Sequence, residues 1–420
     1  MLDSGFAAAQ GGVFAMTGTA RNRQVLTINT GSSSLKAVLY AARDRPELVL
    51  RAQARRIGDS AGYLRITGTE NETLFERDLA SADHAAAFEA TLDWLTQEGL
   101  AATFAAIGHR VVHGGARYRE PLPITPKLTE ALRALAPLNP DHLPQALCGI
   151  EAIERRFPAL PQVACFDTAF HRDMPPCAQM YALPRRFYDE GIRHLGFHGL
   201  SYESIVTALR DQAPALADGR LIVAHLGNGA SVAAIHRGRS IDTSMGYTPA
   251  AGLIMSMRCG DIDPGVLIDL AQRHGMDAQA INHLINREAG LLGVSGRSAD
   301  MRDLLEAEAT DPHAAEAVEM FCYRLRQYIG AYAATLGGLD ALIFTGGIGE
   351  HAAPVRERAC AGLGFLGIEI DSERNDTAES VISSDHSRVS VHVIATDENR
   401  MIARHTLELV NGGRHVRLQH

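Results

Sequence analysis

The chain lacks most of the features that would bind a membrane, a nucleic acid or a zinc ion. It has six cysteines in 420 residues and no Cys-x-x-Cys pair, which is typical of reduced thiols in a cytoplasmic protein rather than of a disulfide framework. No apolar run reaches about 18 residues, so we expect no transmembrane helix. The formal net charge of −9 argues against a nucleic-acid partner, because binding phosphate backbones requires a basic face.

The sequence also lacks the phosphate-binding pattern Gly-x-x-x-x-Gly-Lys-[Ser/Thr], which disfavours a Walker-type ATPase. The segment Gly347-x-Gly349-x-x-Ala352 fits the loose dinucleotide fingerprint. It lies late in the chain, with no second Rossmann half after it, and NAD binding is therefore disfavoured. The same strand, glycine turn and helix can equally hold the adenosine or phosphate end of a nucleotide.

Two glycine-rich hairpins of the same design are present instead, at 24–40 and 221–235. Each has a short apolar run, a turn of small residues and a second apolar run, which is the pattern of a β-hairpin. When the two are superposed, Asn29 falls on His225 and Gly31 on Gly227. Glycines and serines in such turns let backbone N–H groups surround an anion. Two matching hairpins predict two related lobes facing one nucleotide, and hence phosphoryl transfer.

Strands alternate with helices along the rest of the chain, which predicts an α/β protein. We expect a first lobe of residues 22–168 plus 397–420, a second lobe of 169–396, and a final helix that returns to the first lobe. Residues 1–21 lack the basic segment and apolar core of a secretory signal, and we expect a disordered extension there.

Three helix ends are predicted from local residues. Thr125 is expected to cap a helix that opens with Pro126, and Gly337 to end a helix that runs from about Ala314 to Leu336. Ser201 is expected to cap a helix that runs through Leu209.

Two arginines and two acids lie where a phosphoryl-transfer site needs them. Arg110 and Arg258 lie in glycine-rich stretches, where a guanidinium suits bidentate recognition of carboxylate or phosphate. A surface or lobe-bridging salt bridge is the structural alternative. Asp167 ends one expected strand and Glu398 follows another, positions suited to Mg²⁺ held between phosphates. Helix capping or simple solvation is the alternative for each acid.

Three histidines call for different interpretations. No His-Glu-x-x-His pattern occurs, which disfavours a zinc site. His109 is expected to be a buried, hydrogen-bonded histidine. The glycines beside His198 and His225 favour a functional role for these two.

Taken in order, these segments resemble the acetate kinase family, from about Gln24 to His405. The resemblance implies two lobes of duplicated ribonuclease H-like (actin- or hexokinase-type) topology with a nucleotide cleft between them, and a cytoplasmic homodimer. It also implies reversible phosphoryl transfer from ATP to acetate, giving ADP and acetyl phosphate. Propionate or butyrate kinase is the alternative within the class, and a non-catalytic ATP-switched module is the alternative outside it. Besides both hairpins, the motifs that carry the resemblance are 108–115, 196–199, 225–229, 242–246, 260–264 and 344–350.

The resemblance assigns roles residue by residue. The catalytic residues would be Arg110, Asp167, His198, His225 and Arg258. Asn29 and Glu398 would serve Mg²⁺, with Mn²⁺ as a substitute. The acyl group would contact Arg110, Val112, Leu138, Phe197 and Pro249. The nucleotide would contact Ser32, Ser34, Lys36, His225, Asn228, Gly229, Asp300, Met301, Arg302, Gly347, Ile348 and His351.

The chain departs from the family pattern at three places. Asn139 stands where the family usually has a histidine, with Asp141 and His142 as nearby substitutes, and His351 stands where the family has asparagine. The N-terminal extension is not typical of the family. Val112, rather than a smaller residue, favours acetate over propionate. An acetate carboxylate is already ionised at neutral pH, so the predicted reaction needs no general base.

Overall fold

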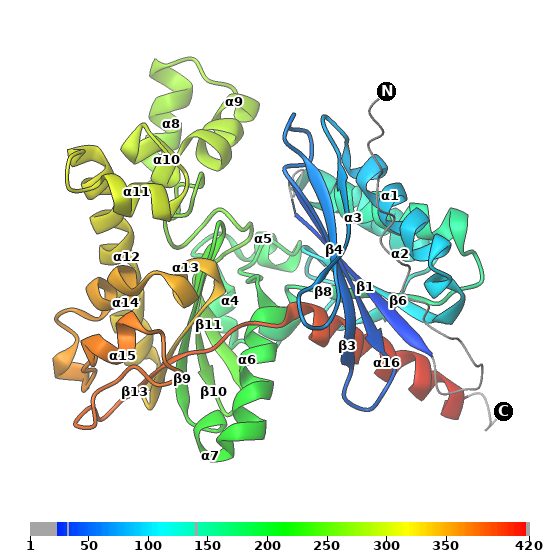
Figure 1. Cartoon of the computed structure of the whole chain (residues 1–420). Helices are drawn as coiled ribbons and strands as arrows, with labels where there is room; N and C mark the ends of the chain where they lie inside the picture. The colour runs from blue at the N-terminus through cyan, green and yellow to red at the C-terminus, as the bar shows by residue number, and fades with distance from the viewer. Residues whose placement is uncertain (1–22, 32, 139–141, 417–420) are drawn as a thin grey trace, which may run out of the picture.

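The computed structural model describes residues 23–31, 33–138 and 142–416. Two β-sheets lie side by side, each with helices packed on both faces (Figure 1). The first sheet comprises β1 Gln24–Thr30, β2 Ser34–Ala41, β3 Glu47–Arg55, β4 Tyr63–Thr67, β5 Thr73–Asp78, β6 Phe104–Val111, β7 Leu122–Pro123 and β8 Gln162–Phe166. The second comprises β9 Arg220–Leu226, β10 Ala230–His236, β11 Arg239–Thr243, β12 Ala341–Thr345 and β13 Ser390–Val393. Each sheet with its covering helices is called a lobe below.

The two sheets share one topology. In the first, β1, β2 and β3 form an antiparallel meander, and β6 and β8 continue from β1 in parallel. In the second, β9, β10 and β11 form the same meander, and β12 and β13 continue from β9 in parallel. The first sheet adds β4, β5 and β7 at its edges. The two related lobes expected from the hairpins, and the duplicated ribonuclease H-like topology that the family resemblance implies, are therefore confirmed, whereas the predicted residue boundaries of the lobes stay a prediction.

Helices fill the connections between strands, and none of the described ones is both long and apolar enough to span a bilayer. The longer helices are α1 His84–Gln97, α2 Pro126–Leu135, α3 Leu143–Arg156, α6 Gly199–Gln212, α8 Pro264–Arg273, α12 Pro312–Leu336, α14 Ala353–Cys360 and α16 Glu398–Val416. The shorter α-helices are α4 Pro176–Gln179, α5 Arg185–Asp189, α7 Pro214–Ala217, α9 Ala278–His283, α10 Gly290–Ser295, α11 Met301–Ala307, α13 Gly346–His351 and α15 Ser372–Asp376. Single turns are η2 Leu100–Thr103, η3 Ala136–Leu138, η4 Ala169–His171, η5 Leu284–Glu288 and η6 Gly364–Leu366.

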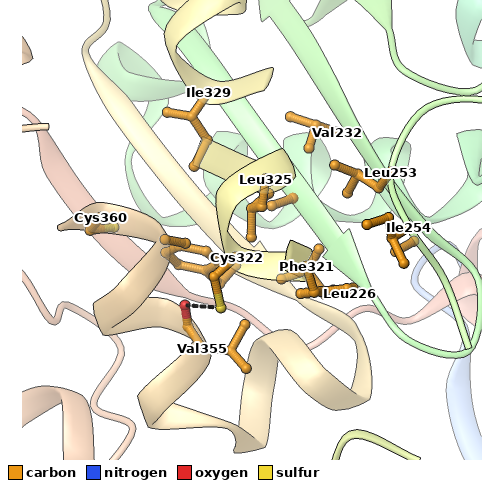
Figure 2. Packing of buried hydrophobic residues seen from close by; sticks show 14 of the residues in the cluster. Leu226, Val232, Leu253, Ile254, Phe321, Cys322, Leu325, Ile329, Val355 and Cys360 are labelled. Atoms are coloured by element: carbon orange, nitrogen blue, oxygen red, sulfur yellow. Dashed lines mark hydrogen bonds between the residues drawn. The ribbon is translucent and has the colours of Figure 1, made fainter. Parts of the chain in front are cut away.

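The central strand β9 is buried on both faces, so nearly all its residues are apolar. Its even-numbered side chains, such as Ile222 and Leu226, pack against α12 and α14. Leu221 and Val223 point to the opposite face and pack against α6. Figure 2 shows the first of these cores. It contains Leu226, Val232, Leu253, Ile254, Phe321, Cys322, Leu325, Ile329, Val355 and Cys360.

The chain crosses between the two lobes twice, and each crossing leads into a helix that packs on the sheet it has reached. These two helices, α6 and α16, are called the exchanged helices below. After β8 of the first sheet the chain forms α6, which packs on the second sheet. After β13 of the second sheet it forms α16, which packs on the first sheet (Figure 1). Gly108 on β6 allows this close approach, since a Cβ there would lie 2.3 Å from Thr406 Oγ1 of α16. His405 of α16 and Glu203 of α6 then join the two exchanged helices, with Nε2 and Oε2 2.8 Å apart.

Several local predictions are confirmed. Thr125 caps α2 ahead of Pro126, and Gly337 ends α12 in the left-handed conformation. All six cysteines are free, and the final helix does return to the first sheet. The expected cap at Ser201 is wrong. Helix α6 begins at Gly199 after His198, so Ser201 lies inside its first turn, where the hydroxyl contacts a histidine ring instead of a backbone N–H. The expected extension at 1–21 lies outside the described residues.

The pair between His405 and Glu203 predicts how stability depends on pH. Burial alone would lower the pKa of His405, but Glu203 and Glu408 raise it from 6.5 to about 9. The pair therefore stabilises the fold fully below about pH 6.5, and this contribution is lost as the pH rises through about 9. We expect His405→Gln to lower the free energy of unfolding by about 1–2 kcal/mol at pH 6 and by little at pH 10, measured by urea denaturation. An equal loss at both pH values would contradict a charged pair.

Candidate functional site

The predicted residues of the first lobe meet where its parallel strands end. Arg110 comes from the end of β6, and Asp167 follows β8 directly. The Arg110 guanidinium donates to both carboxylate oxygens of Asp167, with Nε to Oδ1 at 2.9 Å and Nη2 to Oδ2 at 2.6 Å. Adjacent parallel strands bring their carboxyl ends to one edge of the sheet, which is why residues 57 positions apart can pair. The ion pair named as the structural alternative is real, but it lies within one lobe.

Asn29 and Glu398 complete this half of the site. Arg110 Nη1 donates to Asn29 Oδ1 at 3.0 Å, and Asn29 Nδ2 donates to Glu398 Oε2 at 2.8 Å. Burial alone would raise the pKa of Glu398, but Arg110 holds it below its usual range. Burial raises the pKa of Asp167, and the bidentate guanidinium opposes that shift. The bidentate contact with Arg110 pairs the Asp167 carboxylate with a cation, and the lowered pKa of Glu398 favours its ionised form.

The second lobe contributes two neighbouring imidazoles, from His198 before α6 and His225 on β9. Their ring centroids lie 4.2 Å apart, and the ring planes are tilted by 31° to each other. His198 Nδ1 contacts Ser231 Oγ at 2.8 Å, and His225 Nδ1 contacts Ser201 Oγ at 2.8 Å. Burial, together with nearby cations, holds the pKa of His198 well below 6.5, and burial lowers that of His225 to about 4. Both rings are therefore neutral at physiological pH.

Arg258 and the turn of the second hairpin lie beside these rings. A Cβ on Gly229 would lie 3.3 Å from His198 Nε2 and 3.4 Å from Arg258 Nη1. Only glycine at this position lets a ligand approach both groups closely. Arg258 Nη1 also donates to the Pro249 carbonyl oxygen at 3.2 Å, which joins a predicted catalytic residue to a predicted acyl contact.

The first hairpin brings a further cation. Lys36 lies opposite Asn29 on β2, is exposed, and lowers the pKa values of both Glu398 and His225 through its charge. Ser34 opens β2 and is half-buried, whereas Ser32 lies outside the described residues. Asn228 is exposed in the turn of the second hairpin.

The predicted adenosine contacts come from two separate turns. Gly347 and His351 are exposed on α13 and Ile348 is half-buried. The carbonyl oxygens of Gly349 and Glu350 accept hydrogen bonds from Arg356, a fully buried guanidinium that sequence reasoning missed. Asp300 caps α11 by accepting from the N–H of Arg302, and both of these residues are exposed. The Met301 side chain is buried in the second-lobe core, so only its backbone is available to a nucleotide here.

The structure describes most of the predicted acyl contacts, but not all of them. Val112 and Phe197 are both buried and belong to one apolar cluster, although Val112 follows a strand of the first sheet. The Leu138 side chain lies outside the described part, as do Asn139 and Asp141, so the departure from the family at Asn139 stays untested. His142 precedes α3. His109 is buried and bonded to Gln162 Oε1 at 2.7 Å, as predicted.

Helix polarity adds to the field of these side chains. Both exchanged helices start at the site, α6 directly after His198 and α16 at Glu398. The two starts are held together, since the N–H of Asp397 donates to Ser204 Oγ at 3.2 Å. The N-terminal end of a helix favours an anion. The arrangement therefore provides arginines, a lysine, imidazole nitrogens and two helix N-termini for a polyanion such as a nucleotide.

Comparison with known proteins agrees with this chemistry. The sequence model of the Acetokinase family matches residues 24–404. An acetate kinase from Rhodopseudomonas palustris is 45% identical over 397 residues, covering 93% of this chain and 99% of that protein. The chain belongs to the acetokinase family.

Solved structures of the acetokinase family share the fold. A propionate kinase from Francisella tularensis matches with a TM-score of 0.85 at 36% identity, over 91% of this chain and 99% of that one. An acetate kinase from Porphyromonas gingivalis matches with a TM-score of 0.82 at 38% identity, over 92% of this chain and 100% of that one. The family thus includes proteins named for two different acyl substrates.

The sequence analysis did not identify three residues whose side chains contact residues of the acetokinase site. Ser201 and Ser231 contact the two imidazoles, and Arg356 holds the α13 turn. Two signals could have found the serines. Ser201 follows His198 by three residues and lies in the first turn of the helix that starts there, and Ser231 lies opposite His225 once the hairpin is in register.

Proposed function

We propose that this protein transfers a phosphoryl group reversibly from ATP to acetate, giving ADP and acetyl phosphate, by direct in-line attack of the acetate carboxylate. The observation that carries the proposal is the meeting of the Arg110 network with Arg258 and two neutral imidazoles, all beside a glycine turn. Phosphoryl transfer requires mainly positioning and charge stabilisation, and these groups supply both. Propionate or butyrate kinase is the alternative within the same mechanism.

In this mechanism Arg110 and Arg258 stabilise the equatorial oxygens of the transferring phosphoryl group. Asp167 and Asn29 orient Arg110, which leaves two of its five N–H donors for substrate. His225 donates a hydrogen bond to the phosphoryl group from a neutral ring, and the neutral His198 ring lies beside it. Val112 and Phe197 enclose the methyl group of acetate and exclude water from it.

Magnesium fits the residues present. No cluster of three or more His, Cys, Asp and Glu side chains occurs among the described residues, but Mg²⁺ bound to a nucleotide needs only one or two protein carboxylates. Asp167 and Glu398 would supply them, with Asn29 beside Glu398. The ion, or Mn²⁺ in its place, would neutralise phosphate charge when bound.

We also propose a cytoplasmic homodimer. Val266 and Ile268 on α8, together with Met320 and Tyr323 on α12, are large apolar side chains that are 41–55% exposed. Large apolar side chains exposed on these two helices support an interface there. Sedimentation velocity at micromolar concentration should give a dimer, and a monomer would contradict the proposal.

The first test is a hydroxamate-trapping assay with ATP, Mg²⁺ and, separately, acetate, propionate and butyrate. We expect the strongest signal with acetate. A stronger signal with propionate or butyrate would keep the mechanism and change the substrate. ATP binding without any acyl phosphate would instead support a switch that uses ATP only to change shape.

Loss of an arginine should separate catalysis from stability. We expect Arg258→Ala to lower kcat about 10³-fold or more, as the loss of an arginine finger does, with little change in melting temperature. Arg110→Ala should lower kcat similarly and also cost about 3–5 kcal/mol of stability, because it leaves the buried Asp167 carboxylate unpaired. Near-normal turnover in either folded variant would overturn the assigned role.

The acyl pocket offers a matched pair of valines. Val112 packs toward the second lobe, whereas Val111 points to the opposite face and packs against α2 and α3. We expect Val112→Ala to raise the ratio of kcat/KM for propionate over acetate about tenfold, because one methylene is worth about 1–3 kcal/mol in an apolar pocket. Val111→Ala should lower stability without moving that ratio. An equal change in both variants would exclude Val112 from the pocket.

A further inference from the structure

Two buried serines each contact one of the two imidazoles of the site. His198 directly precedes helix α6, which carries Ser201, while the β9–β10 hairpin carries His225 and Ser231. The helix serine contacts the hairpin histidine, and the hairpin serine contacts the helix histidine, each at 2.8 Å through Nδ1. Both serines are 0% exposed. The Nδ1 atoms are therefore occupied, and the Nε2 atoms are the ones left for a ligand.

Counting hydrogens decides which way the contact between Ser201 and His225 points. A buried hydroxyl hydrogen without an acceptor is costly. In the described structure the Ser201 hydroxyl has one hydrogen-bond partner, His225 Nδ1. If Nδ1–H donated to Ser201, the hydroxyl hydrogen would have no acceptor. Donation from Ser201 to Nδ1 satisfies every group and places the imidazole hydrogen on Nε2.

The same count does not decide the tautomer of His198. Ser231 Oγ also contacts the Tyr202 hydroxyl, and Tyr202 reaches Thr243 as well. In a chain of hydrogen-bonded hydroxyls, donation can run in either direction along the chain, and every hydroxyl hydrogen still has an acceptor. The assignment is therefore restricted to His225.

We propose that Ser201 is a positioning residue that fixes His225 as the Nε2–H tautomer, so that a neutral ring donates a hydrogen bond to the transferring phosphoryl group. Nε2 lies on the side of the hairpin turn, 4.0 Å from where a Gly227 Cβ would be. Burial keeps the ring neutral, with a pKa of about 4. Ser201 itself is not a nucleophile, because its hydroxyl is fully buried behind the ring.

This inference rests on the proposed phosphoryl transfer, and its first test does not. Histidine ¹⁵N chemical shifts distinguish the two neutral tautomers, and His225→Asn assigns the signal. We expect the Nε2–H tautomer in the wild-type protein at pH 7. An Nδ1–H tautomer would overturn the proposal without any serine variant. An Nε2–H tautomer in a protein that forms no acyl phosphate would overturn the proposed function and leave the tautomer assignment standing.

The second test is kinetic. Ser201→Ala should lower kcat about 10- to 100-fold, as loss of an outer partner of a working histidine does, with KM values for ATP and acetate little changed. It should also give a mixture of His225 tautomers. Ser201→Thr keeps the hydroxyl and should restore both the single tautomer and most of kcat. Unchanged kcat in Ser201→Ala would contradict the role of Ser201.

A matched control lies outside the site. Ser240 Oγ contacts His171 Nδ1 at 2.8 Å, and both residues are buried. His171 Nε2 contacts the Phe197 carbonyl oxygen and is not available to substrate. Ser240→Ala should lower stability but leave kcat and the His225 signal unchanged. A loss of kcat equal to that of Ser201→Ala would show a structural effect common to buried serines and would overturn the positioning role.

Discussion

The contact between α6 and α16 is the constraint on which the rest of the molecule depends. Helix α6 covers the second sheet, whose strands it precedes, and α16 covers the first sheet although it follows the strands of the second. The core of the first lobe is therefore complete only when α16 is in place. The exchange also brings the starts of both helices to one place. His198 and Glu398 thereby face the ends of β6 and β8, and the site forms where the chain crosses between lobes.

Charge balance explains why so many ionised groups can be buried there. Arg110 lies between two carboxylates, and Asn29 satisfies the polar atoms between them. Burying any one of these charges alone would be costly, whereas the hydrogen-bonded group keeps each one paired. Lys36 and Arg258 add positive charge on the sides open to a nucleotide. The site is thus prepared for an anion before one arrives.

The features that could be predicted well from the sequence are those that a local pattern of residues determines. The two hairpins, the cap at Thr125, the end of α12 at Gly337 and the return of the last helix all follow from spacing and turn residues. The pairing of Arg110 with Asp167 followed only in part, from the rule that parallel strands share an edge. The contact of Ser201 with His225 and the hydrogen bonds from Arg356 to the α13 turn could not be predicted. Each depends on which residue distant in sequence takes the place of a local hydrogen-bond partner. Ser201 is the clearest case, since a helix cap was the local expectation.

The order of synthesis gives the helix exchange a further consequence. The first sheet is complete once β8 leaves the ribosome, yet the helix that covers one of its faces, α16, is made only after every described strand of the second sheet. Until then apolar residues such as Val25, Val38 and Tyr40, which pack with Ala403, have no covering partner, and a nascent chain with open apolar surface is prone to misassembly. The sheet that is translated first therefore cannot finish folding until the second sheet has been made.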